Sequence, residues 1–293
     1  MKVLDVSGAA LSQIVEEKVT CPFLGPAVAA CQLPVRNDAG NPLASIEDVR
    51  RLGNTGGGDL GDLLVLFAKG NHAFMRGPMN QLDENVPNEL FSLELPGSQG
   101  SHPGHSGILE GDPEKLGSGR FSQQDFARLA SHSRDGLLKR SEVGRFIAEN
   151  LHRDPNSKVL EATVAKLLLE DLAKTVLSAG ALLPSLFGSD AERDRAHREF
   201  EQKLTKMMGE NNLVGSAGEF GLLFAFLANS PGATEVDGEP TVSFEDVRSM
   251  FAEKRLPDGW EGWKKTRWDW LRNTTGLLKS ALAEYHELKA KRR

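Results

Sequence analysis

The chain has 293 residues, a net charge of −6 and a sequence pI near 5.7. This length accommodates one large domain with a buried core. A chain with net negative charge gives no sign of the basic surface that binds a nucleic-acid backbone. Charged side chains interrupt the N-terminal apolar residues, and no window approaches the roughly 18 apolar residues of a membrane-spanning helix. We therefore expect a cytoplasmic protein with no signal peptide, no membrane span and no nucleic-acid partner.

The two cysteines, Cys21 and Cys31, stand in a segment of helical pattern. A continuous helix would hold them roughly 15 Å apart, which is too far for a disulfide. No cysteine and histidine spacing of zinc-site type accompanies them. Two interpretations stay open at this point: a functional thiol, or two buried structural cysteines, and burial is the commoner fate of cysteine.

Apolar residues recur at three- and four-residue spacing along most of the chain, as in amphipathic helices. Ser45, Ser122, Ser189 and Ser243 each precede acidic residues and are predicted to cap helices. The pattern predicts a single all-α domain over residues 1–293, with 263–293 as a C-terminal packing helix. The predicted helices span 59–75, 122–132, 139–151, 157–181, 189–209, 216–229, 243–254 and 260–290.

Two stretches lack a helical period. The glycine-rich run 53–61 follows no predicted strand and precedes no Lys-Ser or Lys-Thr pair, so a helix-entry loop is favoured over a phosphate-binding loop. Residues 92–120, rich in Pro, Gly, Ser and His, are predicted to form a long loop. Such a loop inside a compact domain commonly carries a binding site. Within it, His102 and His105 are either metal ligands or solvated side chains.

Residues 131–142 partly match an EF-hand calcium loop. Asp135 and Gly136 occupy positions five and six, and Glu142 occupies position twelve. Serines stand at positions one and three, where carboxylates are normally needed, so little charge is available to hold calcium. A tight helix–turn–helix that uses Gly136 is therefore the favoured interpretation.

Cys21 opens the run Cys-Pro-Phe-Leu-Gly-Pro-Ala-Val-Ala-Ala-Cys-Gln-Leu-Pro. This run resembles the N-terminal signature of the haem-thiolate peroxidases, the chloroperoxidase and unspecific peroxygenase family, in which the cysteine binds haem iron. Pro22 suits the first position of a helix, so Cys21 would stand at a helix N-terminus, where free N–H groups favour a thiolate. The resemblance implies that Cys21 is the axial ligand of a b-type haem.

The run Ser-Gly-Ile-Leu-Glu-Gly-Asp at 106–112 is similar to the family's Glu-His-Asp or Glu-Gly-Asp element, which holds a divalent cation beside a haem propionate. The resemblance implies one magnesium, manganese or calcium ion. Its ligands would be the carboxylate of Glu110, the carbonyl of Gly111 and the hydroxyl of Ser118. The spacing from the aspartate to Ser118 is longer here than in the family.

The run Gly-Glu-Phe-Gly-Leu-Leu-Phe-Ala-Phe-Leu at 218–227 is similar to the family's distal helix. It implies that Glu219 is the acid–base group that activates peroxide. Phe220, Leu222 and Phe224 would then shape an apolar substrate face. The three matching elements occur in the family's order and cover most of residues 21–262.

The chain departs from the family near Glu219. Chloroperoxidase supports its distal glutamate with a histidine and peroxygenases use an arginine, and those positions hold Gly111 and Asn212 here. Neither pattern is complete, and His102 or His105 is a candidate substitute.

The resemblance implies a haem-thiolate peroxidase or peroxygenase that uses hydrogen peroxide to oxidise or oxygenate a small, largely apolar organic substrate. Two alternatives stay open. One is a haem-free helical interaction protein with a degenerate EF-hand, in which Cys21 and Glu219 are packing or capping residues. The other is a haem enzyme of this fold that catalyses a non-peroxidative reaction.

Overall fold

The computed structural model describes residues 4–6, 8–19, 21–74, 89–96, 107–110, 120–154, 157, 159 and 212–291. Most of these residues are helical. The helices are α1 (Ala9–Glu17), α2 (Leu24–Ala29), α3 (Ile46–Gly53), α4 (Gly61–Asn71), α5 (Gln123–Ser131), α6 (Arg140–Arg153), α9 (Asn212–Leu227), α10 (Phe244–Phe251) and α11 (Arg267–Lys291), with 3-10 turns η1 (Thr55–Gly57) and η4 (Trp260–Gly262). The predicted helices 157–181 and 189–209 lie outside the described residues.

The predicted helices that fall on described residues are present, with shifted ends. Ser45, Ser122 and Ser243 each accept a hydrogen bond from the backbone N–H of the aspartate three residues on, so these caps are confirmed. Residues 72–74 form a strand instead of continuing α4, and 260–262 form a separate 3-10 turn before α11. None of the described helices combines the length and apolar character needed to cross a membrane.

The mostly helical fold is confirmed, but antiparallel sheets correct the all-α prediction. The strands are two to seven residues long, too short for a period of two to stand out in the sequence. One sheet has the order β1-β2-β3-β5-β4, a second β8-β10-β9, and β6 pairs with β7. The strands are β1 (Leu4–Asp5), β2 (Arg36–Asp38), β3 (Asn41–Ser45), β4 (His72–Phe74), β5 (Leu90–Pro96), β6 (Leu109–Glu110), β7 (Arg120–Phe121), β8 (Leu137–Lys139), β9 (Thr234–Val236) and β10 (Glu239–Ser243).

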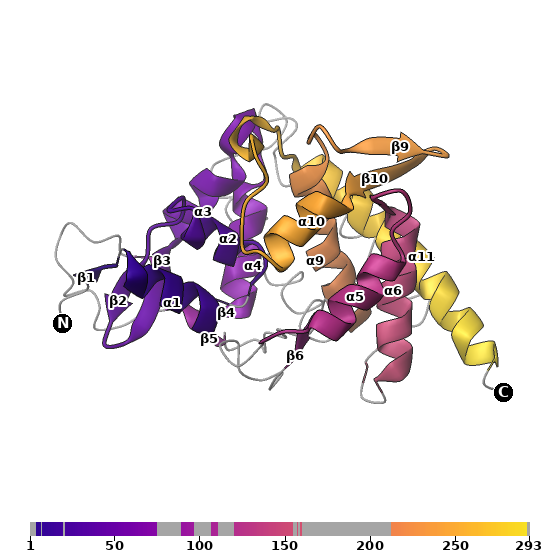
Figure 1. Cartoon of the computed structure of the whole chain (residues 1–293), viewed down its shortest axis with the longest axis horizontal. Coiled ribbons are helices and arrows are strands. Elements are labelled where there is room, and N and C mark those ends of the chain that lie inside the picture. The colour runs from indigo at the N-terminus through magenta and orange to yellow at the C-terminus, as the bar shows by residue number, and fades with distance from the viewer. Residues whose placement is uncertain are drawn as a thin grey trace, which may run out of the picture.

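Figure 1 shows α1 to α4 with the five-stranded sheet at one end of the molecule, and α5, α6, α9 and α11 at the other. Helices α6, α9 and α11 pack against one another. The indole N–H of Trp270 donates to the Gly218 carbonyl at 3.1 Å and joins α11 to α9. One cluster of buried apolar side chains extends from Leu11 in α1 to Ala281 in α11, so the two ends share a core.

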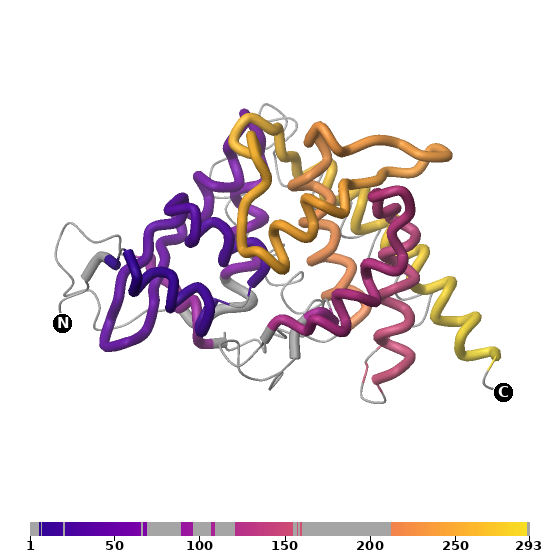
Figure 2. The backbone as a smooth tube through the Cα atoms, in the orientation of Figure 1, coloured from indigo at the N-terminus to yellow at the C-terminus, as the bar shows by residue number. Residues whose placement is uncertain are grey.

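The segment 251–266 links the two ends, as the backbone path in Figure 2 shows. Its turn η4 packs against η1 in the glycine-rich run. Gly56 has a positive φ of 67°, and a Cβ there would overlap the Trp263 carbonyl. A Cβ on Gly58 would likewise overlap the Lys265 carbonyl, while Asp59 N–H donates to that same carbonyl at 2.9 Å. Gly56 and Gly58 therefore allow the backbone of the glycine-rich run to contact the backbone of residues 263–265 just before α4 begins. This agrees with the predicted helix-entry loop.

Candidate functional site

Cys21 stands one residue before the turn that begins α2. The Gly25 N–H donates to the Cys21 carbonyl at 2.9 Å, which is the spacing of a first helical turn. Helix α2 ends at Ala29, and Cys31 follows in the left-handed region with φ 57°. The expected unbroken helix from Cys21 to Cys31 is therefore wrong, because the chain turns at Cys31. Both cysteines are free thiols.

The Cys21 thiol is desolvated although the residue is partly exposed. Burial raises its pKa above the ordinary value of 9.0, while hydrogen bonds from the backbone N–H groups of Leu24 and Phe23 act in the opposite direction. The carboxylate of Glu219 raises this pKa further and the Lys254 ammonium lowers it. The predicted stabilisation by N–H groups is present, but burial outweighs it, so the free thiol is neutral near pH 7.

Helix α9 presents the face that carries Glu219 toward the start of α2. Residues three, four and seven positions apart share a helix face, so Glu219, Leu222 and Phe226 lie on one side of α9. The Phe226 ring meets the edge of Phe23 with centroids 4.7 Å apart. Glu219 itself is half-buried, and its charge reaches the Cys21 thiol. Two elements almost 200 residues apart in sequence therefore bring a thiol and a carboxylate into one site.

Lys254 completes this cluster and was not predicted from the sequence. Its backbone is left-handed, with φ 51°, at the bend that follows α10. The side chain passes over Gly25, where a Cβ would stand 3.4 Å from Lys254 Cδ and 3.8 Å from Nζ. Burial lowers the pKa of Lys254, and the negative charge of an ionised Cys21 raises it. Because Gly25 has no side chain, the Lys254 side chain can pass over it and place its ammonium near the Cys21 thiol.

The donor set at Cys21 fits a thiolate that is bound to a metal. A metal ion deprotonates a coordinating thiol even where burial keeps the free thiol neutral. The N–H groups of Phe23 and Leu24 then supply hydrogen bonds to a sulfur that carries negative charge. Such hydrogen bonds to a ligating sulfur tune the electronic properties of the iron in thiolate-bound haem.

The three side chains predicted to shape a substrate face do not share one face of α9. Leu222 is partly buried on the same face as Glu219. Phe220 lies in the core between Phe146 and Phe251, with ring centroids 6.2 and 6.4 Å away. Phe224 lines a separate pocket on another side of α9. Of the three, Leu222 alone shares the face that Glu219 and Phe226 define.

A groove of about 320 Å³ adjoins the cluster at Lys254. Its walls are the C-terminal end of α2 and the bend that follows α10. The lining residues are Ala29, Ala30, Lys254, Arg255, Leu256, Pro257, Asp258, Gly259, Trp260 and Glu261. Lys254 is therefore the side chain that connects this groove to the Cys21 thiol.

The expected cation ligands lie mostly outside the described residues, as Gly111, Ser118, His102 and His105 do. Glu110 is in β6, where its backbone pairs with Arg120 in β7. Within the described part of the chain, no group of three or more His, Cys, Asp or Glu side chains could hold a metal. The backbone pairing does bring the two ends of the 110–120 segment together.

The segment that resembles an EF-hand loop forms a helix–turn–helix in which arginine side chains lie near Glu142. Gly136 has φ 74°, and strand β8 in this turn pairs with β10, which precedes α10. The Glu142 carboxylate lies 3.0 Å from Arg145, 3.5 Å from His132 and 3.7 Å from Arg134. The acid that would bind calcium is therefore paired with two arginines of the protein, Arg145 and Arg134, and the favoured helix–turn–helix is the observed form.

Comparison of this chain with protein-family models, curated proteins and solved structures finds no significant match.

Proposed function

We propose that this chain is a haem-thiolate peroxidase or peroxygenase, with Cys21 as the iron ligand and Glu219 as the acid–base group. The observation that carries the proposal is that the Glu219 carboxylate lies near enough to the Cys21 thiol for its charge to raise the pKa of that thiol. The resemblance requires these two residues to face one site from separate helices. The contact between Phe23 and Phe226 supports that arrangement independently of any charge.

Cys21 would hold b-type haem through its sulfur, with the N–H groups of Phe23 and Leu24 directed at it. Thiolate-ligated haem supplies iron chemistry in which electron donation from sulfur favours cleavage of the O–O bond. Lys254 adds a positive charge near the sulfur and offsets part of its negative charge. The chain thus keeps the sulfur hydrogen-bonded and partly neutralised in a buried environment.

Glu219 would move the proton of hydrogen peroxide. Its ionised carboxylate would accept a proton from one oxygen of hydrogen peroxide, and the resulting carboxylic acid would donate that proton to the other oxygen. Bound haem would supply the two electrons that cleavage of the O–O bond consumes. Its place on the face of α9 that contacts α2 supports this role. A small, largely apolar organic substrate would approach beside Leu222, which shares that face.

The absorbance spectrum of the reduced carbon-monoxide complex tests the proposal. A thiolate ligand gives a strongly red-shifted Soret band, and we expect Cys21→Ala to abolish this band. Cys31→Ala is the matched control, because Cys31 is exposed, and it should leave the band unchanged. A wild-type spectrum typical of a histidine-ligated haem would overturn the assignment of Cys21.

A divalent cation at Glu110, Gly111 and Ser118 remains part of the proposal. The pairing of β6 with β7, which closes the 110–120 segment, supports it. Elemental analysis of haem-loaded protein should find about one magnesium, manganese or calcium ion per chain. Glu110→Gln should lower that content, and full haem occupancy and activity in metal-free protein would reject the site.

The main alternative is a haem-free helical interaction protein. The raised pKa of the Cys21 thiol favours this alternative, because a neutral buried thiol packs like a small apolar side chain. Purified protein that shows no Soret band after incubation with haemin would support it. If haem binds through Cys21 but peroxide is not consumed, a non-peroxidative haem enzyme becomes the better interpretation.

A further inference from the structure

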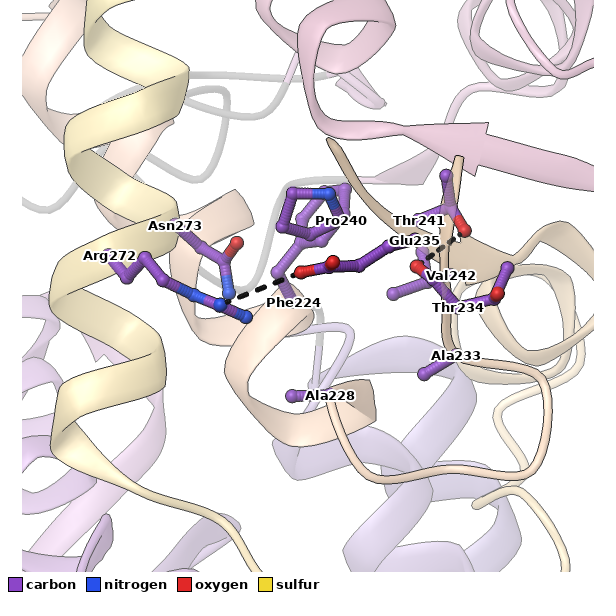
Figure 3. A pocket seen from close by; sticks show the side chains of 10 residues that line it. All are labelled: Phe224, Ala228, Ala233, Thr234, Glu235, Pro240, Thr241, Val242, Arg272 and Asn273. Atoms are coloured by element: carbon purple, nitrogen blue, oxygen red, sulfur yellow. Dashed lines mark hydrogen bonds and ion pairs between the residues drawn. The ribbon is translucent and has the colours of Figure 1, made fainter. Parts of the chain in front are cut away.

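A second pocket lies on another side of α9, away from the face that carries Glu219. It has a volume of about 200 Å³ and is enclosed by α9, α11 and the β9–β10 hairpin. Its apolar wall includes Phe224, Pro240 and Val242. Figure 3 shows three polar side chains converging on the same space: Arg272, Asn273 and Glu235. The pocket therefore combines an apolar wall with a charged opening.

Asn273 is the polar group at the inner end of the pocket. Its side chain is 1% exposed, and its Oδ1 accepts no hydrogen bond from the described residues. In Figure 3 its amide extends from α11 toward Pro240 and Glu235. A buried acceptor without a donor costs about 1–3 kcal/mol, so a ligand N–H here would recover free energy. The neighbouring Thr241 hydroxyl donates instead to the Thr234 carbonyl at 2.9 Å.

Arg272 and Glu235 form the charged opening. Their closest atoms are 3.9 Å apart, and the side chains are 47% and 63% exposed. An exposed ion pair of this length contributes at most about 1 kcal/mol, so opening it costs little. Each charge is then available to a ligand group of the opposite sign. A ligand with one charge would engage one side chain and be repelled by the other.

We propose that this pocket binds a free α-amino acid with a small apolar side chain. Its carboxylate pairs with the Arg272 guanidinium, which offers two parallel N–H donors. Its ammonium donates to Glu235 and to the unpaired Asn273 Oδ1. The apolar side chain packs against Phe224 and Val242. This site is independent of haem and of the proposed reaction at Cys21.

Isothermal titration calorimetry of the full chain with L-valine tests the proposal. We expect binding with a Kd below about 1 mM, and no comparable binding of valinamide, which lacks the carboxylate, or N-acetylvaline, which lacks the ammonium. Arg272→Gln and Glu235→Gln should each weaken binding by about tenfold or more, the effect of losing one charge-assisted hydrogen bond. Both positions are about half exposed, so these variants are expected to fold.

Arg248→Gln is the matched control. Arg248 is 46% exposed, pairs with Glu245 on α10 and is not among the residues that line the pocket. It should bind L-valine as the wild type does. The proposal is overturned if L-valine does not bind at millimolar concentration. It is equally overturned if valinamide or N-acetylvaline binds as tightly as L-valine, or if Arg272→Gln and Glu235→Gln leave the Kd unchanged.

Discussion

The side chain of Lys254 lies over Gly25, with its Cδ 3.4 Å from the position that a Cβ on Gly25 would occupy. This packing directs an ammonium toward the buried thiol of Cys21. Glu219 acts on the same thiol with the opposite sign. The site therefore contains two charges whose effects on the sulfur can be separated by substitution.

The first prediction concerns the thiol of haem-free protein. Lys254→Met removes a charge that lowers the pKa of Cys21, so this pKa should rise above its already raised value. Glu219→Gln removes a charge that raises it, so the pKa should fall. Thiolate absorbance followed against pH in a Cys31→Ser background measures both. Shifts in the same direction, or none, would show that the three groups do not share a site.

The second prediction compares two neighbouring glycines. Gly56 and Gly57 both have positive φ, at 67° and 71°, but only a Cβ on Gly56 would meet other atoms. Gly57→Ala should therefore cost about 1–2 kcal/mol, from backbone conformation alone. Gly56→Ala should cost several kcal/mol in total, because the added carbon overlaps the Trp263 carbonyl. Chemical denaturation measures both, and equal losses would contradict the close contact of η1 with 263–265.

The third prediction is a pH dependence of stability from Lys265. This side chain is fully buried, and its Nζ donates to the Trp260 and Trp263 carbonyls at 2.7 Å and to Thr55 Oγ1 at 3.0 Å. It also lies over the rings of Phe226 and Trp260. Burial lowers the pKa of Lys265 to about 8, while Glu261 acts in the opposite direction.

Between pH 8 and 10.5 the unfolded chain keeps a proton on Lys265 that the folded chain has released. The free energy of unfolding should therefore rise with pH in this range, by at most about 1.4 kcal/mol per pH unit. Lys265→Met should lose this rise, and the exposed Lys279→Met should keep it. Denaturant titrations at several pH values measure the slopes. Identical slopes in wild type and Lys265→Met would contradict the prediction.

Local signals in the sequence identified most helices, because caps such as Ser122 and Ser243 and the three- and four-residue spacing depend only on nearby residues. The sheets were missed because strands such as β2 and β9 are three residues long, too short for an alternating pattern to show. The Asp237-Gly238 turn between β9 and β10 is a local hairpin signal that the helical reading passed over. The break of α2 was also missed. Nothing local indicates the left-handed conformation of Cys31, which is a residue that rarely adopts it.

The sequence singled out Cys21 and Glu219 because each lies at or next to the start of a recognisable run, and the packing of Phe226 on Phe23 places the two runs side by side. Lys254 carried no such signal. From the sequence, a lysine at a bend is expected to have a solvated side chain. The burial of the Lys254 side chain follows from its tertiary packing over Gly25. Phe220 and Phe224 were assigned to a substrate face because they follow Glu219 in an apolar run. An apolar helix such as α9 buries more than one face, and the rings of Phe220 and Phe224 lie away from the face that carries Glu219.

The last prediction concerns peroxide activation by Glu219. Glu219→Gln preserves size and shape but removes the group that can accept and then donate a proton. The rate at which haem-loaded protein reacts with hydrogen peroxide should therefore fall by roughly 10²–10⁴-fold. Haem content and the thiolate spectrum should persist, because Glu219 is not the iron ligand in the proposal. Stopped-flow absorbance measures the rate, with the exposed Glu287→Gln on α11 as the control. A Glu219→Gln variant as fast as wild type would assign proton transfer to another group, and His102 and His105 would be substituted next.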